Sequence, residues 1–209
     1  MKNQARVVVI GGGAIGVSVA YHLAKYGWED VVLVEKHELT SGSTWMAAGN
    51  CSFFHGNYYC TQVNMKSIEI YQKLEKETGQ SVGWHTTGSI RTADNPGRME
   101  ELGYVYSMNR CLGLDVSWIT PEKMKEMHPL MNIEGITGGL YWPDDGDVDP
   151  NGITMAMSIG AKKYGAEINS HTQVTGIDRA ASGEWVVHTD KGDITCEHVV
   201  NAAGLWAPE

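Results

Sequence analysis

The first residues of the chain group into apolar runs separated by an amphipathic stretch. Residues 7–10 are all β-branched and apolar, which predicts a buried strand. Apolar residues then recur at helical spacing from Ala14 to Tyr26, and Gly27 provides a stop. A second apolar run at residues 31–34 predicts another buried strand. This strand–helix–strand order is typical of a parallel α/β sheet.

The rest of the chain carries weaker patterns of the same two kinds. Helical spacing or a capped start predicts helices at 64–78, 121–127 and 150–165. Short β-branched or aromatic runs predict strands at 84–91, 167–168, 173–177, 185–189, 193–196 and 198–204. Because Lys191-Gly192 is a turn signal, we expect the strands between residues 173 and 196 to form a small antiparallel meander.

The turn between the first strand and the first helix is rich in glycine. Gly11 permits a tight turn, Gly13 lets the backbone approach a pyrophosphate, and Gly16 lets the helix pack against the strand. Glu35 closes the second strand nineteen positions after Gly16 and suits a ribose hydroxyl. Phosphates would rest on the unpaired amides of the helix N-terminus. A glycine-rich turn alone often only connects two elements, but strand, helix and acid together predict a dinucleotide cradle.

Residues 39–50 form a second segment with unusual composition. Small and hydroxyl-bearing side chains dominate it, from Thr40-Ser41-Gly42 to Ala47-Ala48-Gly49. Free amides, hydroxyls and small side chains suit a backbone that lies close to a flat ligand. The same composition also suits a polar connection that opens a short helix.

Charge excludes some classes of partner. The chain has 209 residues and a net charge of -9 with acids and bases mixed, so we expect no nucleic acid to bind. Residues 144–149 are the most acidic stretch, which could be a solvated turn or a calcium loop. This loop lacks the downstream glutamate of an EF-hand, and the eight histidines show no zinc spacing. No metal site is therefore predicted.

Cysteine spacing and hydropathy bear on the compartment. The four cysteines show no C-x-x-C spacing, which favours reduced thiols in a cytosol-like compartment. No apolar run is long enough to span a bilayer. The first strand begins a few residues after Met1, which leaves no room for a targeting segment. We therefore expect a cytoplasmic protein, with the mitochondrial matrix as the less favoured alternative.

The order of these elements predicts the architecture. Parallel strands, an antiparallel meander and a strand that returns to the cradle are more typical of a flavoprotein than of a nicotinamide dehydrogenase. We expect an α/β fold with a Rossmann-type, glutathione-reductase-like FAD-binding domain at residues 1–50 and 145–209. Residues 51–144 would be part of an inserted substrate domain. Because the chain ends at Glu209, directly after the returning strand, we expect the first domain to continue further.

Several stretches resemble one family along essentially the whole chain. They match the dimethylglycine and sarcosine dehydrogenases of the glycine-oxidase-like (D-amino-acid-oxidase type) FAD enzymes, and most of all the dimethylglycine dehydrogenases. The stretch that includes Gly42-Ser43-Thr44-Trp45 and the following Ala47-Ala48-Gly49 is more specific than the others. The matching stretches are residues 8–13, 32–36, 39–45, 87–91, 145–150 and 200–204.

The resemblance implies that the cradle holds FAD, with Glu35 on the adenosine ribose. Residues 42–50 would line the flavin, Val174 would approach the adenine side, and the segment around Gly204 would close over the dinucleotide. The full set of implied cofactor-binding residues is Gly11, Gly13, Ala14, Ile15, Gly16, Glu35, Lys36, Gly42, Ser43, Thr44, Trp45, Met46, Ala47, Ala48, Gly49, Asn50, Val174, Ala203, Gly204 and Trp206.

One position departs from the family pattern. After Gly-Ser-Thr-Trp, the family's dehydrogenases have a histidine bonded covalently to the flavin, whereas this chain has Met46. A thioether has no ring nitrogen for that linkage, and His55 is the alternative donor in the same loop. We expect non-covalent FAD, with Met46 packed against the edge of the flavin ring.

The resemblance also implies a reaction: oxidative N-demethylation of a small N-methylated amine such as dimethylglycine or sarcosine. FAD would take a hydride from the N-methyl carbon. The iminium product would hydrolyse to formaldehyde or pass its carbon to tetrahydrofolate, bound by a module beyond residue 209. The electron acceptor is not predicted.

Catalytic residues are not assigned by the sequence. His55, His85 and Arg91 are candidate substrate-side groups, but a structural or surface role suits each of them as well. The same broad family includes a phosphatase regulatory protein that also lacks the linking histidine. The alternative to an amine dehydrogenase or oxidase is therefore a non-catalytic, FAD-binding regulatory protein.

Overall fold

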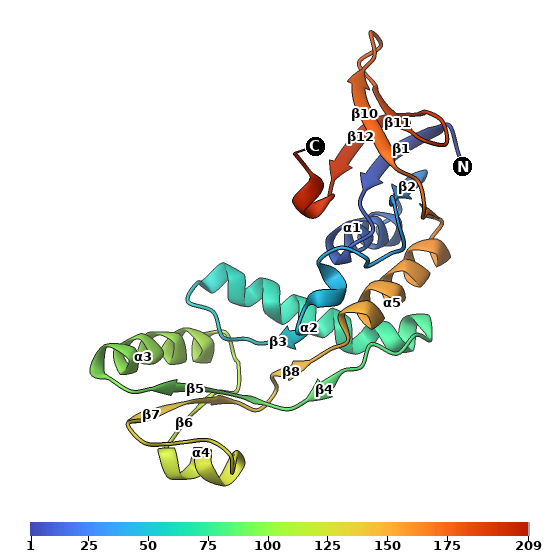
Figure 1. Ribbon diagram of the computed structural model, residues 1–209. Coiled ribbons are helices and arrows are strands. Elements are labelled where there is room, and N and C mark those ends of the chain that lie inside the picture. The colour runs from blue at the N-terminus through green and yellow to red at the C-terminus, as the bar shows by residue number, and fades with distance from the viewer. Residues whose placement is uncertain (209) are drawn as a thin grey trace. The chain divides into compact units, whose positions relative to one another are not determined.

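The computed structural model describes residues 1–208, which divide into two compact units (Figure 1). The first unit comprises Met1–Ala48, Lys73–Gly83 and residues 149–208, and the second comprises Gly49–Gln72 and Trp84–Val148. Each unit is built around its own sheets. The chain therefore leaves the first unit and returns to it.

The first unit contains one six-stranded sheet. Its central strand β1 pairs in parallel with β12 on one side and with β2 on the other, and β9 extends the parallel part. On the far side of β12, strands β11 and β10 continue the sheet with antiparallel pairing, and the three strands form the expected meander. In sheet order the strands are β10 (Val174–Arg179), β11 (Trp185–Thr189), β12 (Ile194–Asn201), β1 (Gln4–Ile10), β2 (Val31–Val34) and β9 (Glu167–Asn169). The predicted Rossmann-like α/β fold is confirmed.

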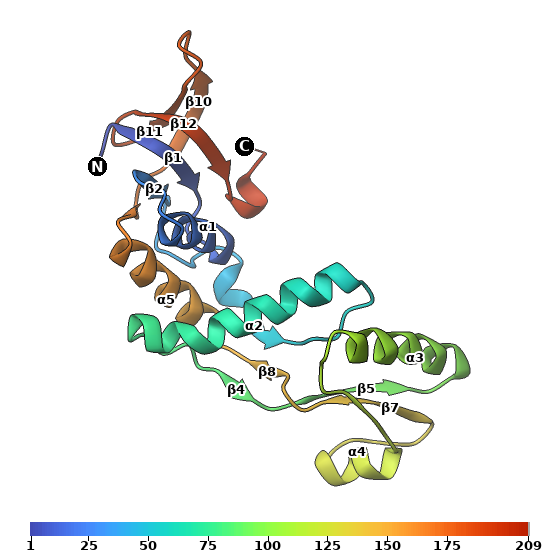
Figure 2. The ribbon, with the colours of Figure 1, turned by 180° about the vertical axis from the view of Figure 1, so that it is seen from behind.

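Burial explains why the apolar runs form the centre of this sheet. Every residue of β2 and the three consecutive valines of β1 are buried. Helices α1 (Ala14–Lys25) and α5 (Pro150–Lys163) lie side by side against the sheet, as Figures 1 and 2 show. A Cβ atom at Gly160 would lie only 2.6 Å from the ring of Tyr21, so the glycine permits this close helix packing.

The second unit contains two three-stranded antiparallel sheets, β3-β8-β4 and β5-β7-β6. Its core includes the fully buried side chains of Leu102, Leu140 and Trp142. The elements are β3 (Asn50–Cys51), β4 (His85–Thr86), β5 (Ser89–Ala93), α3 (Pro96–Cys111), β6 (Ser117–Ile119), α4 (Pro121–Met127), β7 (Gly138–Trp142) and β8 (Gly146–Asp147).

Two helices differ from the sequence prediction. Helix α2 spans Tyr58–Thr78 and begins six residues before the expected start, because the Asn57 side chain accepts hydrogen bonds from the amides of Tyr59 and Cys60. Helix α3 was not predicted. Its start does carry a signal, since Asn95 caps it and proline follows.

The strand predictions were wrong at two places. The predicted strand at residues 84–91 is divided at Gly88, which has a φ of +69° and separates β4 from β5. The two strands expected at 193–196 and 198–204 form the single strand β12, which ends at Asn201.

The C-terminal end of α2 belongs to the first unit, whereas the predicted substrate domain at residues 51–144 includes it. Glu77 explains this placement through hydrogen bonds to both helices of the first unit. Its carboxylate accepts from the Tyr21 hydroxyl at 2.7 Å, from Lys25 Nζ at 2.7 Å and from the Tyr164 hydroxyl at 2.9 Å. Residues 73–83 are therefore tied to α1 and to the end of α5.

Candidate cofactor-binding site

The turn after β1 is shaped by two backbone contacts. Gly11 has a φ of +112°, and a Cβ atom there would overlap the carbonyl oxygen of Ala202 at the end of β12. A Cβ atom on Gly16 would likewise overlap the carbonyl oxygen of Gly11. Both glycines are thus required by the packing of backbone on backbone.

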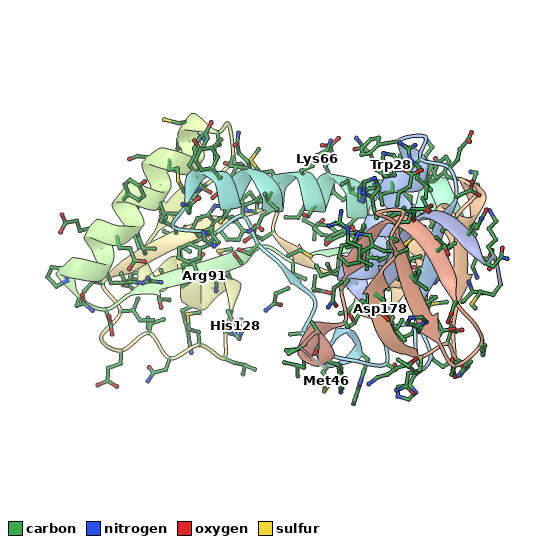
Figure 3. The ribbon with its side chains drawn as sticks, turned by 90° about the horizontal axis from the view of Figure 1, so that it is seen from above. Trp28, Met46, Lys66, Arg91, His128 and Asp178 are labelled. Carbon is green, nitrogen blue, oxygen red and sulfur yellow. The ribbon has the colours of Figure 1, made fainter. Side chains whose placement is uncertain are left out.

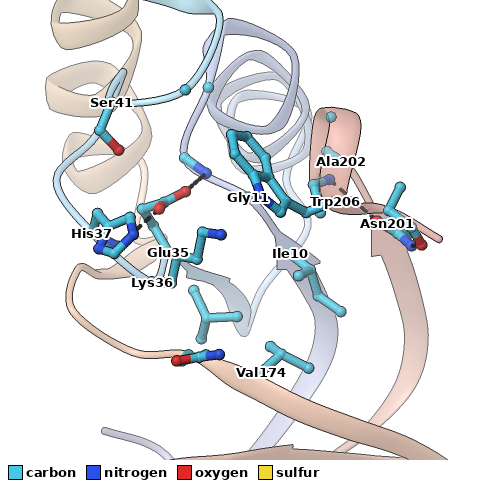
Figure 4. A pocket seen from close by; sticks show the side chains of 18 of the residues that line it. Ile10, Gly11, Glu35, Lys36, His37, Ser41, Val174, Asn201, Ala202 and Trp206 are labelled. Atoms are coloured by element: carbon cyan, nitrogen blue, oxygen red, sulfur yellow. Dashed lines mark hydrogen bonds between the residues drawn. The ribbon is translucent and has the colours of Figure 1, made fainter. Parts of the chain in front are cut away.

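Gly12 and Glu35 hold each other in place. Glu35 Oε2 accepts a hydrogen bond from the Gly12 amide at 2.6 Å, and Oε1 accepts one from the His37 amide at 2.8 Å (Figure 4). A Cβ atom on Gly12 would lie 2.8 Å from Glu35 Cγ and 2.7 Å from Leu39 Cδ2. Gly12 was not among the residues predicted for the site. The signal was a glycine in the middle of Gly11-Gly12-Gly13, where the dinucleotide motif itself accepts any residue.

Thr44 caps the cradle helix from a distant part of the chain. Helix α1 begins after Gly13, which has no side chain to accept from the first amides. Thr44 Oγ1 supplies the missing acceptor and lies 3.0 Å from the Ala14 amide nitrogen. A Cβ atom on Gly13 would lie 3.2 Å from the same oxygen. The segment at residues 39–50 is therefore hydrogen-bonded to the glycine-rich turn after β1.

These loops surround a cavity of about 1010 Å³ that lies within the first unit. Its walls are the turn after β1, the end of β2, the segment at 41–44, the edge of β10 and the segment at 201–207 (Figure 4). The predicted cofactor-binding residues that line it are Gly11, Gly13, Ala14, Ile15, Glu35, Lys36, Gly42, Ser43, Thr44, Val174, Ala203, Gly204 and Trp206.

Part of the lining was not predicted from the sequence. The strand-end residues beside the glycines follow from the fold once the sheet order is known. The sequence of residues 172–177 gives little indication of a binding role, and Val174 was predicted only through the family resemblance. Their wall is attached to the cradle by the Thr172 amide, which donates to the Glu35 carbonyl oxygen at 2.7 Å. The missed lining residues are Ile10, Gly12, Val34, His37, Ser41, Thr172, Gln173, Thr175, Gly176, Ile177, Asn201, Ala202 and Ala207.

Several predicted residues do not line this cavity. Gly16 lies behind it, where it packs against Gly11. Trp45 and Met46 are 58% and 63% exposed and belong to the short helix η1 (Thr44–Met46). Met46 is labelled in Figure 3. Ala47 and Ala48 follow η1, and Gly49 and Asn50 belong to the second unit. Contact between Met46 and the flavin ring stays a prediction.

The cavity carries little positive charge. Among the described residues that line it, Lys36 is the only lysine or arginine. Its Nζ atom lies 4.2 Å from the centroid of the Trp206 ring, in the range of a cation–π contact. Trp206 itself lies in η2 (Gly204–Trp206), which follows β12. The other groups available to an anion are backbone amides, hydroxyls and the N–H groups of His37, Gln173 and Asn201.

The donor set fits a dinucleotide. The amides at the start of α1 other than that of Ala14, which Thr44 caps, suit phosphate oxygens. Glu35 presents a carboxylate at the cavity wall, where a ribose hydroxyl could donate. Added side chains at Gly11, Gly12 or Gly16 would disrupt this wall. The cavity volume is also in the range of cofactor sites. FAD would thus be held by Glu35, Lys36, the α1 amides and the hydroxyls of residues 41–44.

The candidate substrate-side groups each have a separate partner in the second unit. His85 Nδ1 lies 3.0 Å from Asp147 Oδ1, and His55 Nδ1 accepts from the Asn57 amide at 3.1 Å. The Arg91 guanidinium lies 5.0 Å from the centroid of the Phe54 ring. These contacts do not bring the three side chains together, and no catalytic role follows from them.

The acidic stretch at 144–149 supports the second unit structurally. Asp145 is 1% exposed. Its carboxylate accepts from the Phe53 amide at 2.8 Å, from the Ser52 hydroxyl at 2.7 Å and from the Ser89 hydroxyl. Within residues 1–208, no three metal-binding side chains gather in a way that could hold an ion. None of the helices within these described residues is long and apolar enough to cross a membrane.

Nearly the whole chain is similar to one known protein family. The chain belongs to the FAD dependent oxidoreductase family (DAO), whose model matches residues 6–209. The predicted family and its FAD cofactor are thereby confirmed. The Rossmann-like sheet and the glycine cradle described above are the parts of the chain that suit this cofactor.

Particular relatives are similar over the whole chain. Mouse mitochondrial dimethylglycine dehydrogenase is 47% identical over 208 residues, which cover 100% of this chain and 24% of that protein. The mouse mitochondrial pyruvate dehydrogenase phosphatase regulatory subunit is 38% identical over 209 residues, with coverage of 100% and 24%. The crystal structure of L-proline dehydrogenase from P. horikoshii superimposes with a TM-score of 0.91 at 32% identity, covering 100% of this chain and 55% of that one. The chain thus spans about a quarter of the length of these curated relatives.

Proposed function

We propose that the protein is an FAD-dependent amine dehydrogenase or oxidase that oxidises the N-methyl group of a small secondary or tertiary amine. Dimethylglycine and sarcosine are the leading substrates. The observation that carries this proposal is the 47% identity to a dimethylglycine dehydrogenase over the whole chain, cradle included. The cavity supports the cofactor half of the proposal, because its donors match a dinucleotide.

The residues of this chain would act mainly by binding and orientation. When bound, FAD would supply the chemistry by accepting two electrons as a hydride from the N-methyl carbon. Glu35 would fix the adenosine ribose, and the α1 amides with Thr44 would hold the pyrophosphate. These contacts would orient the cofactor relative to the protein. Transfer of the carbon to tetrahydrofolate would require a module outside this chain.

Met46 leads us to propose a non-covalent flavin. Its thioether cannot replace the ring nitrogen of a linking histidine, and no cysteine or histidine occurs at residues 41–50. Precipitation with acid should therefore leave the yellow colour in the supernatant. Colour in the washed pellet would contradict the proposal and direct attention to His55.

A matched pair of variants sharpens this experiment. Met46→His introduces the missing nitrogen, and Met46→Leu preserves an apolar side chain of similar volume. We expect acid-stable flavin only in Met46→His, detected by fluorescence of the denatured band on a gel. If Met46→His carries no covalent flavin, residues other than 46 must also direct the linkage.

The regulatory alternative is favoured by one comparison, the 38% identity to a phosphatase regulatory subunit over the whole chain. Reduction of the flavin distinguishes the two functions. The protein is loaded with FAD and mixed anaerobically with dimethylglycine, sarcosine and related methylamines, while the visible flavin absorption is recorded. Loss of this absorption with one amine is the expected result. Bound flavin that no amine reduces would favour the regulatory function.

A further inference from the structure

Thr40 has an unusual backbone conformation at the entrance to the second loop. Its φ is +71°, in the left-handed region that β-branched residues rarely occupy. Asp30 and His171 also have positive φ values, but those residue types adopt this region more readily. Such a conformation persists where surrounding contacts enforce it, and it is concentrated at functional sites.

Contacts of the Thr40 backbone explain what enforces the conformation. The Thr40 amide donates to the Gly12 carbonyl oxygen at 3.0 Å, and the Thr40 carbonyl oxygen accepts from the Trp45 amide at 3.3 Å. No hydrogen bond of the Thr40 hydroxyl is found within residues 1–208. The backbone of this residue, and not its side chain, therefore joins the two loops.

Residues 40–44 form what we call the strap. One end is bonded to Gly12 through the Thr40 amide, and the other end is bonded to Ala14 through the Thr44 hydroxyl. The four residues from Ser41 to Thr44 line the cavity between these two points. Both ends of the strap thus meet the turn that would hold a pyrophosphate.

The charge of the cavity gives the strap a chemical role. A pyrophosphate brings negative charge to a site with a single lysine, and Lys36 already lies against the Trp206 ring. The Thr44 oxygen accepts from Ala14, so its own proton is free to be donated. Hydroxyl donation to an anion gives a short, charge-assisted hydrogen bond.

We infer that Thr40 is a positioning residue for cofactor binding, because its left-handed backbone preforms the strap that presents hydroxyl donors to the pyrophosphate. This inference rests on the proposed FAD site and assigns Thr40 and the strap to its phosphate part. The strap compensates for the scarcity of cations around the cavity. Both ends of the strap are held by hydrogen bonds within the protein, which reduces the ordering cost of binding.

Three substitutions of Thr40 separate backbone from side chain. Thr40→Pro removes the amide hydrogen and locks φ near −65°, so it breaks the strap at its first end. Thr40→Gly keeps the amide and accepts the positive φ, and Thr40→Val keeps the shape but removes the hydroxyl. Isothermal titration calorimetry of the purified apoprotein with FAD, ADP and adenosine measures each effect.

We expect Thr40→Pro to weaken the binding of FAD and of ADP at least about tenfold, which is the effect of one lost charge-assisted hydrogen bond. The affinity for adenosine, which has no phosphate, should change by less than about threefold, because its binding is not coupled to the strap. The Gly and Val variants should bind FAD within about threefold of wild type, because both keep the backbone amide. The inference would be overturned if Thr40→Pro bound ADP with wild-type affinity. It would also be overturned if the variant lost as much affinity for adenosine as for ADP.

A second pair of variants covers the case in which Thr40→Pro does not fold, which circular dichroism would reveal. Thr44→Val removes the hydroxyl at the other end of the strap, and Thr44→Ser retains it. The Val variant should lose ADP affinity and the Ser variant should keep it, whereas equal binding by both would overturn the inference. Failure of the wild-type protein to bind FAD would instead refute the proposed function, so the two failures are distinguishable.

Discussion

Two carboxylates of the molecule are held by backbone amides, yet their surroundings are opposite. Glu35 in the first unit accepts two amide hydrogen bonds and lines an open cavity. Asp145 in the second unit is buried and accepts one amide and two hydroxyl hydrogen bonds. A carboxylate offers about four acceptor positions. Glu35 therefore keeps accessible positions for a ligand, whereas Asp145 is nearly saturated by its own chain.

The difference shows how an acidic residue in a motif can be assigned. Both residues lie in stretches that resemble the family, so the resemblance alone does not separate them. Accessibility and free acceptor positions do, because a ligand can bond only to an oxygen that it reaches. We expect loss of Asp145 to lower stability and loss of Glu35 to lower affinity.

Asp145→Ala should have the largest effect of all. It leaves a buried amide and two half-buried hydroxyls without their acceptor inside the second unit, and an unsatisfied donor that is fully buried costs about 1–3 kcal/mol. We expect the free energy of unfolding to fall by about 4 kcal/mol, measured by urea denaturation. Asp144→Ala is the matched control. This neighbouring residue is exposed, so a change within about 0.5 kcal/mol is expected. Equal effects of the two variants would contradict the structural role of Asp145.

Glu35→Ala tests the other side of the comparison. Loss of the ribose acceptor should raise the dissociation constant for FAD about 100-fold, which corresponds to about 2.7 kcal/mol. The unfolding free energy of the apoprotein should change by only about 1 kcal/mol, because the freed amides lie beside the cavity, where water can reach them. Quenching of FAD fluorescence measures the affinity.

Glu38→Ala is the control for Glu35. Glu38 also follows β2 and bonds to His171, but its side chain is 75% exposed and does not line the cavity. The prediction requires FAD affinity to remain at the wild-type level in this control. If Glu35→Ala lowered stability but not FAD affinity, Glu35 would be a structural carboxylate like Asp145.

The cradle was predictable from sequence because its constraints are local. Buried valines, a glycine turn and an acid at a fixed spacing predicted β1, α1 and β2 within a few residues. Helix α4 was predicted at its observed bounds, because Thr120 caps its start and proline follows. Local pattern and tertiary structure agree at these places.

The parts that were missed depend on contacts between distant segments. No local pattern shows that a side chain at Gly12 would collide with Glu35, or that Thr44 caps α1. The wall at residues 172–177 is fixed by sheet order and by the Thr172 bond to Glu35. Such features require the register of strands that lie far apart in sequence.

Glu77 is intermediate between the two carboxylates, since it is partly buried and fully engaged by side chains. Burial alone would raise the pKa of Glu77, but hydrogen bonds from Lys25, Tyr21 and Tyr164 outweigh it and lower the pKa. A lowered pKa means that the stabilisation is present above the unfolded value of 4.5 and is lost as the pH falls through the folded value.

Glu77→Gln should therefore reduce the unfolding free energy by about 1 kcal/mol at pH 7, and the difference from wild type should shrink below about pH 4. Urea denaturation at several pH values measures this. Glu126→Gln, which breaks an exposed pair with Lys123, should have little effect at any pH. A difference for Glu77→Gln that does not vary between pH 7 and pH 3 would show that charge is not the cause.

The smallest effect on stability is expected at His188 in the meander, because the two carboxylates that it contacts are exposed. Asp193 and Asp178 lie 2.9 and 3.1 Å from its two ring nitrogens, and hydrogen bonds to these two acids raise its pKa. A ring that donates to both acids must be protonated. Stability from this raised pKa is fully present below the unfolded value of 6.5 and is lost as the pH rises through the folded value.

His188→Gln should therefore lower Tm by only on the order of 1 °C at pH 5.5, because water competes for these exposed charges. The difference from wild type should disappear in alkaline solution, where His188 is neutral. In a background with both Asp178→Asn and Asp193→Asn, the His188 substitution should have no pH-dependent effect. A shift comparable to that of Asp145→Ala would mean that exposure does not separate structural carboxylates from solvated ones in this protein.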